Sequence, residues 1–177
     1  MDQRSIRTRK AIKTALINLM KTTSLPKISV TEVVRTAGIT RATFYLHYQN
    51  INQLYDDLCN DFLIDLGSIV VSSYKNKTKL DYEFLNQQLY TYLYKNKAIH
   101  VLLYNKDNQI FISKLKKELL YKIMKHEEIS TNDIYSQIEI PFIISGAVEV
   151  YSKLILKEIP VKSSIAIEQI NKILRKF

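Results

Sequence analysis

A glycine between two short helical segments is the feature that most restricts how this 177-residue chain can fold. Ser29 followed three residues later by Glu32 is a capping-box pattern, which predicts that a helix begins there. Gly38 suits the left-handed position that ends such a helix after about eight residues. Thr40 is placed to cap another short helix over residues 41–47. This spacing predicts a helix, a tight turn and a second helix, which is a helix-turn-helix unit.

The segments on either side complete a three-helix unit. An earlier helix is predicted over residues 5–23, because its apolar residues recur at helical spacing on one stripe. Asn50 with Gln53 is another capping-box pattern and predicts that a fourth helix opens at residue 51. Phe44, with Tyr48 beside it, is expected to pack the third helix against the first two. The outer face of that helix then keeps its polar side chains, which are Thr40, Arg41, Thr43, Tyr45 and His47.

A short helix with such an outer face fits the major groove of DNA. Arginine can bind guanine through two hydrogen bonds, and hydroxyl groups can bind phosphates or base edges. Helix N-termini at Ser29 and Asn50 can also direct backbone N–H groups toward phosphates. The pattern predicts double-stranded DNA as a partner.

The distribution of charge supports a polyanionic partner. The net charge is +9, and residues 1–50 carry nine Lys and Arg against Asp2 and Glu32. A positive field concentrated in one segment favours nucleic acid first and an anionic membrane surface second. The alternative is that the charge only gives the protein a basic, soluble surface and indicates no partner.

The segment KISVTEVVRTAGITRATFYLHYQN resembles the DNA-binding domain of the TetR family of bacterial transcriptional regulators, and the likeness covers residues 5 to about 58. Its strongest signature runs from Thr43 to Tyr48. The resemblance implies base contacts for Thr31, Arg41 and Ala42. It implies contacts to phosphates or neighbouring bases for Ser29, Thr40, Thr43, Tyr45 and His47, and Tyr48 completes the predicted DNA-binding set.

Two positions depart from the family pattern. The family usually has Phe where this chain has Tyr48, a change that adds a hydroxyl. It usually has Lys where this chain has Ile51, and that Lys commonly holds a phosphate at the start of the fourth helix. The departure at Ile51 puts one backbone contact in doubt, which Arg4 and Arg7 could replace through salt-sensitive phosphate contacts.

From residue 51 onward the apolar pattern is helical to the end. Helices are predicted over about 51–74, 82–93, 99–104 and 108–126, with KNKTK at 75–79 as a polar linker. Residues 131–158 are the most apolar long segment, in which Pro141 either kinks a helix or begins a new one. Ser163 or Ser164 is expected to cap a last helix. The sequence predicts an all-α fold of about nine helices, with a DNA-binding domain over residues 1–50 and a helical regulatory and dimerisation domain over residues 51–177.

The end of the chain also resembles the last two helices of TetR-type regulators. Phe142, Gly146, Leu154 and Pro160 fill the family pattern of an aromatic, a glycine, an apolar helix and a proline-containing turn. In the family these helices pair with a second subunit, which implies a homodimer. The residues expected in this seam are Ala147, Val148, Tyr151, Ile155, Ile167, Ile170 and Leu174. The alternative is that all of them belong to the core of one chain.

The resemblance further implies a pocket among the middle helices for an effector, which would be a small apolar or aromatic molecule. The residues expected to line it by helix position are Tyr55, Cys59, Phe62, Tyr90, Tyr94, Leu103, Phe111 and Phe142. For each of them, ordinary core packing is the alternative role.

An enzyme is not expected, because the chain has no HExxH, CxxC or glycine-rich phosphate loop, and no cofactor or metal is predicted. The acidic residues Asp56, Asp57, Asp61 and Asp65 could form a cation site, but a solvated helix face is the commoner reading. A single cysteine and the absence of any apolar stretch near ~20 residues favour a cytoplasmic protein with no membrane span.

The prediction is a ligand-responsive repressor that binds a palindromic operator as a dimer. The alternatives are a transcriptional activator or co-activator, or a nucleoid-binding adaptor, that uses the same fold and works through a protein partner.

Overall fold

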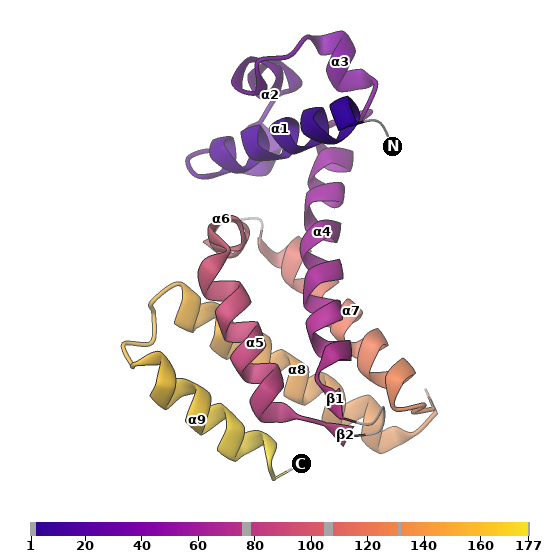
Figure 1. Cartoon of the computed structure of the whole chain (residues 1–177), viewed down its shortest axis with the longest axis vertical. Coiled ribbons are helices and arrows are strands. Elements are labelled where there is room, and N and C mark those ends of the chain that lie inside the picture. The colour runs from indigo at the N-terminus through magenta and orange to yellow at the C-terminus, as the bar shows by residue number, and fades with distance from the viewer. Residues whose placement is uncertain (1–2, 76–78, 105–107, 131, 177) are drawn as a thin grey trace.

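The structure is a computed structural model, which describes residues 3–75, 79–104, 108–130 and 132–176 (Figure 1). Helices dominate, as predicted, and the described part contains nine α-helices, one 3-10 helix and one small β-hairpin. The first elements are α1 (Gln3–Met20), η1 (Leu25–Lys27), α2 (Val30–Ala37), α3 (Arg41–Tyr45) and α4 (Ile51–Ser72). The hairpin of β1 (Tyr74–Lys75) and β2 (Lys79–Leu80) follows. The remaining helices are α5 (Tyr82–Lys95), α6 (Lys97–Tyr104), α7 (Asn108–His126), α8 (Ile134–Ile155) and α9 (Ser163–Leu174).

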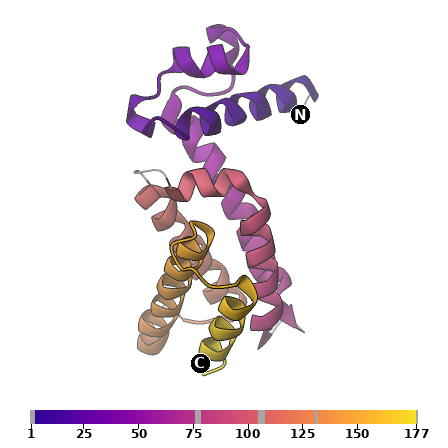
Figure 2. The ribbon, with the colours of Figure 1, turned by 90° about the vertical axis from the view of Figure 1, so that its left-hand side faces the viewer.

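Helices α1 to α3 gather at one end of the molecule, which we call the head, and α5 to α9 form the larger body (Figures 1 and 2). The long helix α4 leaves the head and runs down into the body (Figure 1). One cluster of buried side chains passes without a break from Leu16 in α1 through Leu58 in α4 to Leu102 in α6. The head is therefore packed against the body through α1, α4 and α6.

The helix boundaries in the head follow the capping residues. Ser29 accepts a hydrogen bond from the Glu32 backbone, and the Glu32 side chain accepts one from the Ser29 backbone, so the predicted capping box is confirmed. Gly38 ends α2 at φ 67°, a left-handed conformation that favours glycine. Asn50 caps α4 as predicted, but the Gln53 side chain accepts from the Gln49 backbone rather than from Asn50, which makes the second capping box incomplete.

Two expectations for the rest of the chain need correction. The segment predicted as a plain linker at 75–79 is flanked by the paired strands β1 and β2, and its residues 76–78 lie outside the described part. Neither Ser163 nor Ser164 caps the last helix, because its N-cap position is Lys162 and makes no side-chain bond. Of the two alternatives for Pro141, a kinked helix or the start of a new one, the structure excludes the second, since α8 runs through it.

Among the described helices, none combines the length and the apolar character that a membrane span requires.

Candidate DNA-binding surface

The apolar side of α3 fixes its position on the head. Phe44 is completely buried, and its ring meets that of Tyr48 at a centroid distance of 5.9 Å. The Tyr45 ring lies edge-on to Phe44 at 5.5 Å, yet about half of Tyr45 remains exposed. The helix therefore has one face in the core and the opposite face in solvent, as the sequence predicts.

Arg41 lies on the solvent face and reaches across both helices of the helix-turn-helix unit. Its guanidinium donates to the Thr31 hydroxyl on α2 at 3.4 Å and to the Tyr45 hydroxyl on α3 at 3.5 Å. Both hydrogen bonds are long and exposed, so they orient the guanidinium without burying it. Arg41 can exchange them for stronger hydrogen bonds to a base edge or a phosphate.

The first turn of α3 is held by hydroxyl groups. Thr40 accepts a hydrogen bond from the Thr43 backbone at 3.1 Å, and the two threonine hydroxyls lie 2.9 Å apart. Six residues of the predicted DNA-binding set are exposed, namely Ser29, Thr31, Thr40, Arg41, Ala42 and Tyr45. Thr43 and His47 are half-buried. The structure thus brings these eight residues onto the α2–α3 side of the head.

Tyr48 requires a correction, because the structure places it inside the head. It is only 2% exposed, and its hydroxyl donates to the Asp57 carboxylate at 2.7 Å. Arg9 Nε donates to the same hydroxyl at 3.4 Å. A side chain that is buried and bonded in this way has no free group for DNA, so we exclude Tyr48 from the proposed contact surface.

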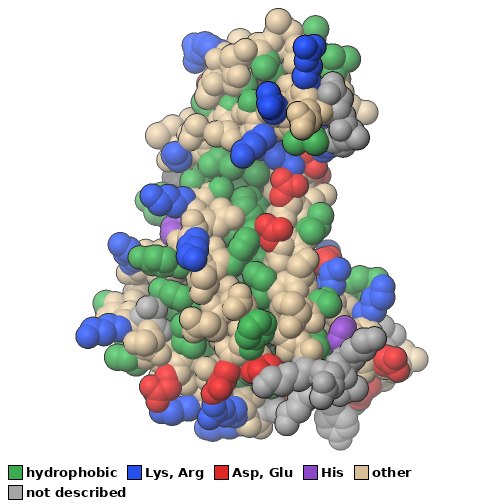
Figure 3. All heavy atoms as spheres, viewed as in Figure 1, with side chains coloured by type: hydrophobic (Ala, Val, Ile, Leu, Met, Phe, Trp, Pro, Cys, Tyr) green, Lys and Arg blue, Asp and Glu red, His purple; other side chains and the backbone are tan. Residues whose placement is uncertain are grey.

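Tyr48 instead belongs to a polar cluster that joins α1 to α4, which we call the joint (Arg9, Lys13, Tyr48, Asp57 and Asp61). Arg9 pairs with Asp57 at 2.8 Å, and Lys13 pairs with Asp57 at 2.9 Å and with Asp61 at 2.5 Å. Figure 3 shows acidic side chains on α4 below the basic side chains of the head. Asp57 and Asp61 of α4 thus pair with basic residues of the head instead of forming a bare solvated face.

The environment of the joint favours the ionised form of Asp57 and the protonated form of Tyr48. Burial raises the pKa of Asp57, but hydrogen bonds from Tyr48, Lys13 and Arg9 outweigh it and leave that pKa below its usual value. Burial raises the pKa of Tyr48 to about 12, so its hydroxyl stays protonated and can donate. The remaining acids of α4 are also engaged, since Asp56 pairs with Lys114 at 2.5 Å and Asp65 accepts from Tyr92 at 2.7 Å. Among the described residues no group of His, Cys, Asp and Glu could hold a metal ion.

The sequence does not predict the joint, because its residues lie far apart along the chain. The one available signal was the hydroxyl that Tyr48 adds where relatives usually carry Phe. Replacing Tyr48 by Phe is expected to lower the free energy of unfolding by about 1 kcal/mol, because a partly exposed charged group loses one hydrogen bond. Urea unfolding would measure the change, with Tyr45→Phe, on the exposed face, as the matched control. Equal stability of the Tyr48 variant and the wild type would contradict the structural role.

The basic residues outside the joint remain on the surface of the head. Arg7, Lys10, Lys21, Lys27 and Arg35 are all exposed. Arg7 and Lys10 border a shallow groove between α1 and α2 that Thr14 and Thr36 also line. Ile51, where the family usually has Lys, is half-buried in the first turn of α4 and packs against the core. The positive charge on the surface of the head is therefore supplied by residues that precede α4 rather than by the start of α4.

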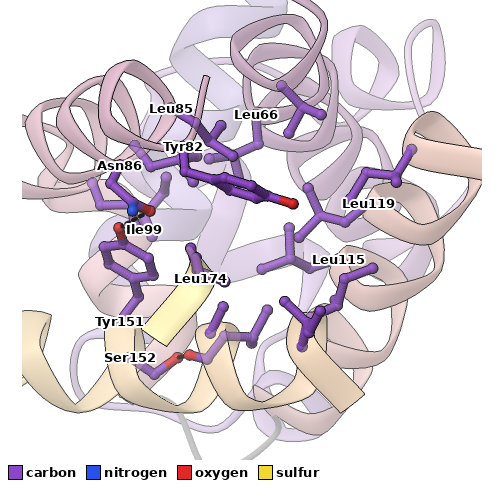
Figure 4. A pocket seen from close by; sticks show the side chains of 18 of the residues that line it. Leu66, Tyr82, Leu85, Asn86, Ile99, Leu115, Leu119, Tyr151, Ser152 and Leu174 are labelled. Carbon is purple, nitrogen blue, oxygen red and sulfur yellow. Dashed lines mark hydrogen bonds between the residues drawn. The ribbon is translucent and has the colours of Figure 1, made fainter. Parts of the chain in front are cut away.

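Most of the residues that the sequence predicts for an effector pocket lie away from the cavity in the body. A cavity of about 110 Å³ opens in the body between α4, α5, α7 and α8 (Figure 4), and only Leu103 and Phe111 of the predicted set line it. Tyr55, Cys59 and Phe62 are buried in the main core instead. Burial also raises the pKa of the Cys59 thiol to about 11, which makes it an unreactive core residue. Tyr90 and Tyr94 stack on each other at 5.8 Å along α5, outside the cavity.

The residues predicted for a subunit seam are mostly packed within the chain itself. Val148, Tyr151, Ile155, Ile170 and Leu174 are buried, whereas Ala147 and Ile167 are half-buried. The exposed apolar side chains of α8 and α9 are different ones, with Phe142 73% exposed. The others in this group are Ile134, Ile138, Ile165 and Ile173. Five of the seven residues predicted for the seam therefore pack in the core of their own chain.

Comparison with known proteins places this geometry in context. No protein-family model matches the chain. Over 114 residues the chain is 31% identical to DhaS of Lactococcus lactis subsp. lactis (strain IL1403), which is described as the HTH-type transcriptional activator of the dhaKLM operon. This match covers 64% of the chain and 51% of that protein, so the aligned part spans about half the length of the relative.

Solved structures match over nearly the whole chain. A TetR transcriptional regulator from Streptococcus agalactiae 2603V superposes with a TM-score of 0.72 at 20% identity, covering 97% of this chain and 96% of its own. A TetR-family regulator from Haemophilus influenzae RD gives 0.65 at 17% identity, with coverages of 97% and 96%. The dihydroxyacetone kinase operon activator DhaS gives 0.61 at 20% identity, with coverages of 96% and 94%. The chain has the fold of the TetR-family transcriptional regulators.

Proposed function

We propose that the chain is a sequence-specific DNA-binding transcriptional regulator. The observation that carries the proposal is the shape of α3, which buries Phe44 completely and leaves Arg41 and Tyr45 in solvent on a basic head. A short helix held in this way can enter a major groove, and the surrounding cations can bind phosphates. The proposed contact residues are Ser29, Thr31, Thr40, Arg41, Ala42, Thr43, Tyr45 and His47.

The proposed division of the chain is a DNA-binding domain over residues 1–50 and a helical domain over residues 51–177. Helix α4 begins at Ile51, directly after the cap at Asn50, and carries both the joint residues near the head and Leu66 and Val70 in the body. The two parts share one rigid helix, so a change in the body can alter the position of the head.

The proposed assembly is a homodimer through α8 and α9, which lie together on one side of the body (Figure 2). An apolar groove runs between these helices and is bordered by Phe142, Gly146, Val150 and Ile173. A second copy of the chain is the proposed occupant, because a two-fold axis would bring the same exposed apolar residues against each other. Two heads could then read half-sites about 34 Å apart in a palindromic operator.

Repression is the proposed direction of regulation, and activation is the second candidate. Activation is supported by the sequence relative, which is described as an activator of an operon. A reporter gene placed behind the bound site would separate the two, since deletion of a repressor raises expression and deletion of an activator lowers it.

Arg41→Ala is expected to weaken binding to the specific site by roughly 1–3 kcal/mol and to loosen the preference at one base pair. The reason is that Arg41 is the one side chain of the α3 outer face that can form two parallel hydrogen bonds to a guanine. Fluorescence anisotropy with specific and random duplexes would measure the effect.

Arg7→Ala is the contrasting variant, because Arg7 lies on α1 away from the recognition helix. It should weaken binding to all duplexes about equally and lower the salt slope by roughly one unit. An equal loss on specific and random DNA for Arg41→Ala would remove the proposed role of Arg41.

A further inference from the structure

The orientation of α3 depends on a small number of contacts. The helix comprises five residues, Arg41–Tyr45, and lies on the side of the head that faces away from the body (Figure 1). Phe44 is the residue of this helix that is completely buried. A helix of this length is not stable by itself and takes its orientation from its surroundings. The direction in which Arg41 and Tyr45 point therefore depends on how the ends of α3 are held.

Tyr48 holds the C-terminal end of α3. Its backbone N–H donates to the Phe44 carbonyl at 3.0 Å, so it continues the last turn of the helix. Its hydroxyl donates to the Asp57 carboxylate of α4 at 2.7 Å. Leu46, which lies between the helix and Tyr48, is exposed and supplies no comparable anchor. A shift of the end of α3 relative to α4 therefore stretches the hydrogen bond between Tyr48 and Asp57.

The Asp57 carboxylate ties the same point to α1. Arg9 pairs with this carboxylate at 2.8 Å and Lys13 pairs with it at 2.9 Å. Both cations come from α1, whereas the Tyr48 hydroxyl comes from the end of α3. Hydrogen bonds to an ionised acceptor are roughly twice as strong as those between neutral groups. One carboxylate of α4 thus fixes α1 and the end of α3 together.

The neighbouring acid of α4 has a different connection. Asp56 directly precedes Asp57 and carries the same type of side chain, but it pairs with Lys114 of α7 at 2.5 Å. Asp56 therefore connects α4 to the body, and Asp57 connects it to the head. Because both residues change the charge of α4 equally when they are neutralised, a comparison of the two separates the effect of charge from the effect of position.

We propose that the joint positions α3 for DNA, and that the Tyr48 hydroxyl and the Asp57 carboxylate thereby set how strongly the protein prefers its specific DNA sequence. Both are positioning residues that do not contact DNA. When their hydrogen bond is lost, α3 occupies its binding orientation for a smaller fraction of the time, and the affinity for the specific site falls by that fraction. Binding to random DNA depends on phosphate contacts and is not lowered. The effect on DNA rests on the proposed function, whereas the anchoring of α3 does not.

The anchoring is tested on the full chain without DNA, by NMR residual dipolar couplings, which report the orientation of each backbone N–H bond in the folded protein. In Tyr48→Phe and Asp57→Asn the couplings from Arg41 to Tyr48 should become smaller, because α3 then samples several orientations. The couplings of α2 and α4 should stay as in the wild type. Asp56→Asn is the matched control and should change none of these couplings. Wild-type couplings for α3 in both variants of the joint would overturn the proposal.

The effect on sequence preference is tested with a duplex that the wild type selects from a random pool, and with a random duplex of equal length. Tyr48→Phe should lower the ratio of the two affinities about five-fold, as expected for one hydrogen bond, and Asp57→Asn about ten-fold. Asp56→Asn should raise both affinities equally, because it removes a negative charge, and should leave the ratio unchanged. All proteins are compared at a temperature at which circular dichroism shows them to be folded, so a loss of stability does not alter the ratio.

The possible outcomes separate this inference from the proposed function. A wild-type preference that persists in Tyr48→Phe and Asp57→Asn would overturn the inference and leave the proposed function intact. A ratio that falls as much in Asp56→Asn as in Asp57→Asn would also overturn it, because charge alone would explain the change. A wild type that selects no sequence from the pool would contradict the proposed function and the predicted effect on preference, and the dipolar couplings would then decide whether the joint anchors α3.

Discussion

Phe44→Ala is expected to lower the free energy of unfolding by about 3–5 kcal/mol and to abolish DNA binding. Phe44 is completely buried at the centre of the head, and its removal leaves a cavity between α3 and the helices behind it. Most of the packing that holds the five-residue α3 in place is lost with it, because so short a helix is not stable by itself. Thermal or urea unfolding followed by circular dichroism measures the first effect, and anisotropy with the specific duplex measures the second.

Leu46→Ala is the matched control for this prediction. Leu46 lies two residues away but is 83% exposed, so its truncation should change stability by less than about 0.5 kcal/mol. If Phe44→Ala were as stable as Leu46→Ala, the packing described for α3 would be wrong.

Phe142→Glu is expected to convert the proposed dimer into a monomer. Phe142 projects from α8 with 73% of its surface exposed, and a two-fold axis would bury it in both subunits at once. Two uncompensated charges in one apolar interface should raise the dissociation constant at least ~100-fold, since each 1.4 kcal/mol is worth a factor of ten. Analytical ultracentrifugation over a range of protein concentrations measures the change.

Ile64→Glu serves as the comparison, because Ile64 is similarly exposed, at 65%, but lies on α4. It should leave the dimer intact. A Phe142→Glu variant that sediments like the wild type would place the interface on another face of the body. The folded monomer should keep its helical content, because Phe142 contributes little to the core of its own chain.

The head could be predicted closely because its signals are local. The caps at Ser29, Thr40 and Asn50 and the left-handed Gly38 each act within a few residues, and the structure confirms all four. The burial of Phe44 follows from the same short pattern. The hydrogen bonds of the Tyr48 hydroxyl could not be predicted from such local signals, since its partners Arg9 and Asp57 come from two other helices.

The body could be predicted only as far as its helices. Helical periodicity shows which face of a helix is apolar, but not whether a neighbouring helix or a second subunit covers that face. Val148 and Tyr151 were for this reason assigned to a subunit seam, whereas they pack inside the chain. Asn86 and Tyr82 were missed as cavity residues, although a polar Asn beside Leu85 in an apolar stripe was a usable signal.

Binding of the purified chain to the DNA upstream of its own gene, at several salt concentrations and against random DNA, is the most direct test of its proposed function. We expect tight binding to a specific duplex, a steep salt dependence on both DNAs, and loss of the preference for the specific duplex in Arg41→Ala. Equal binding to both DNAs, unchanged by Arg41→Ala, would contradict the proposal that α3 recognises a specific DNA sequence.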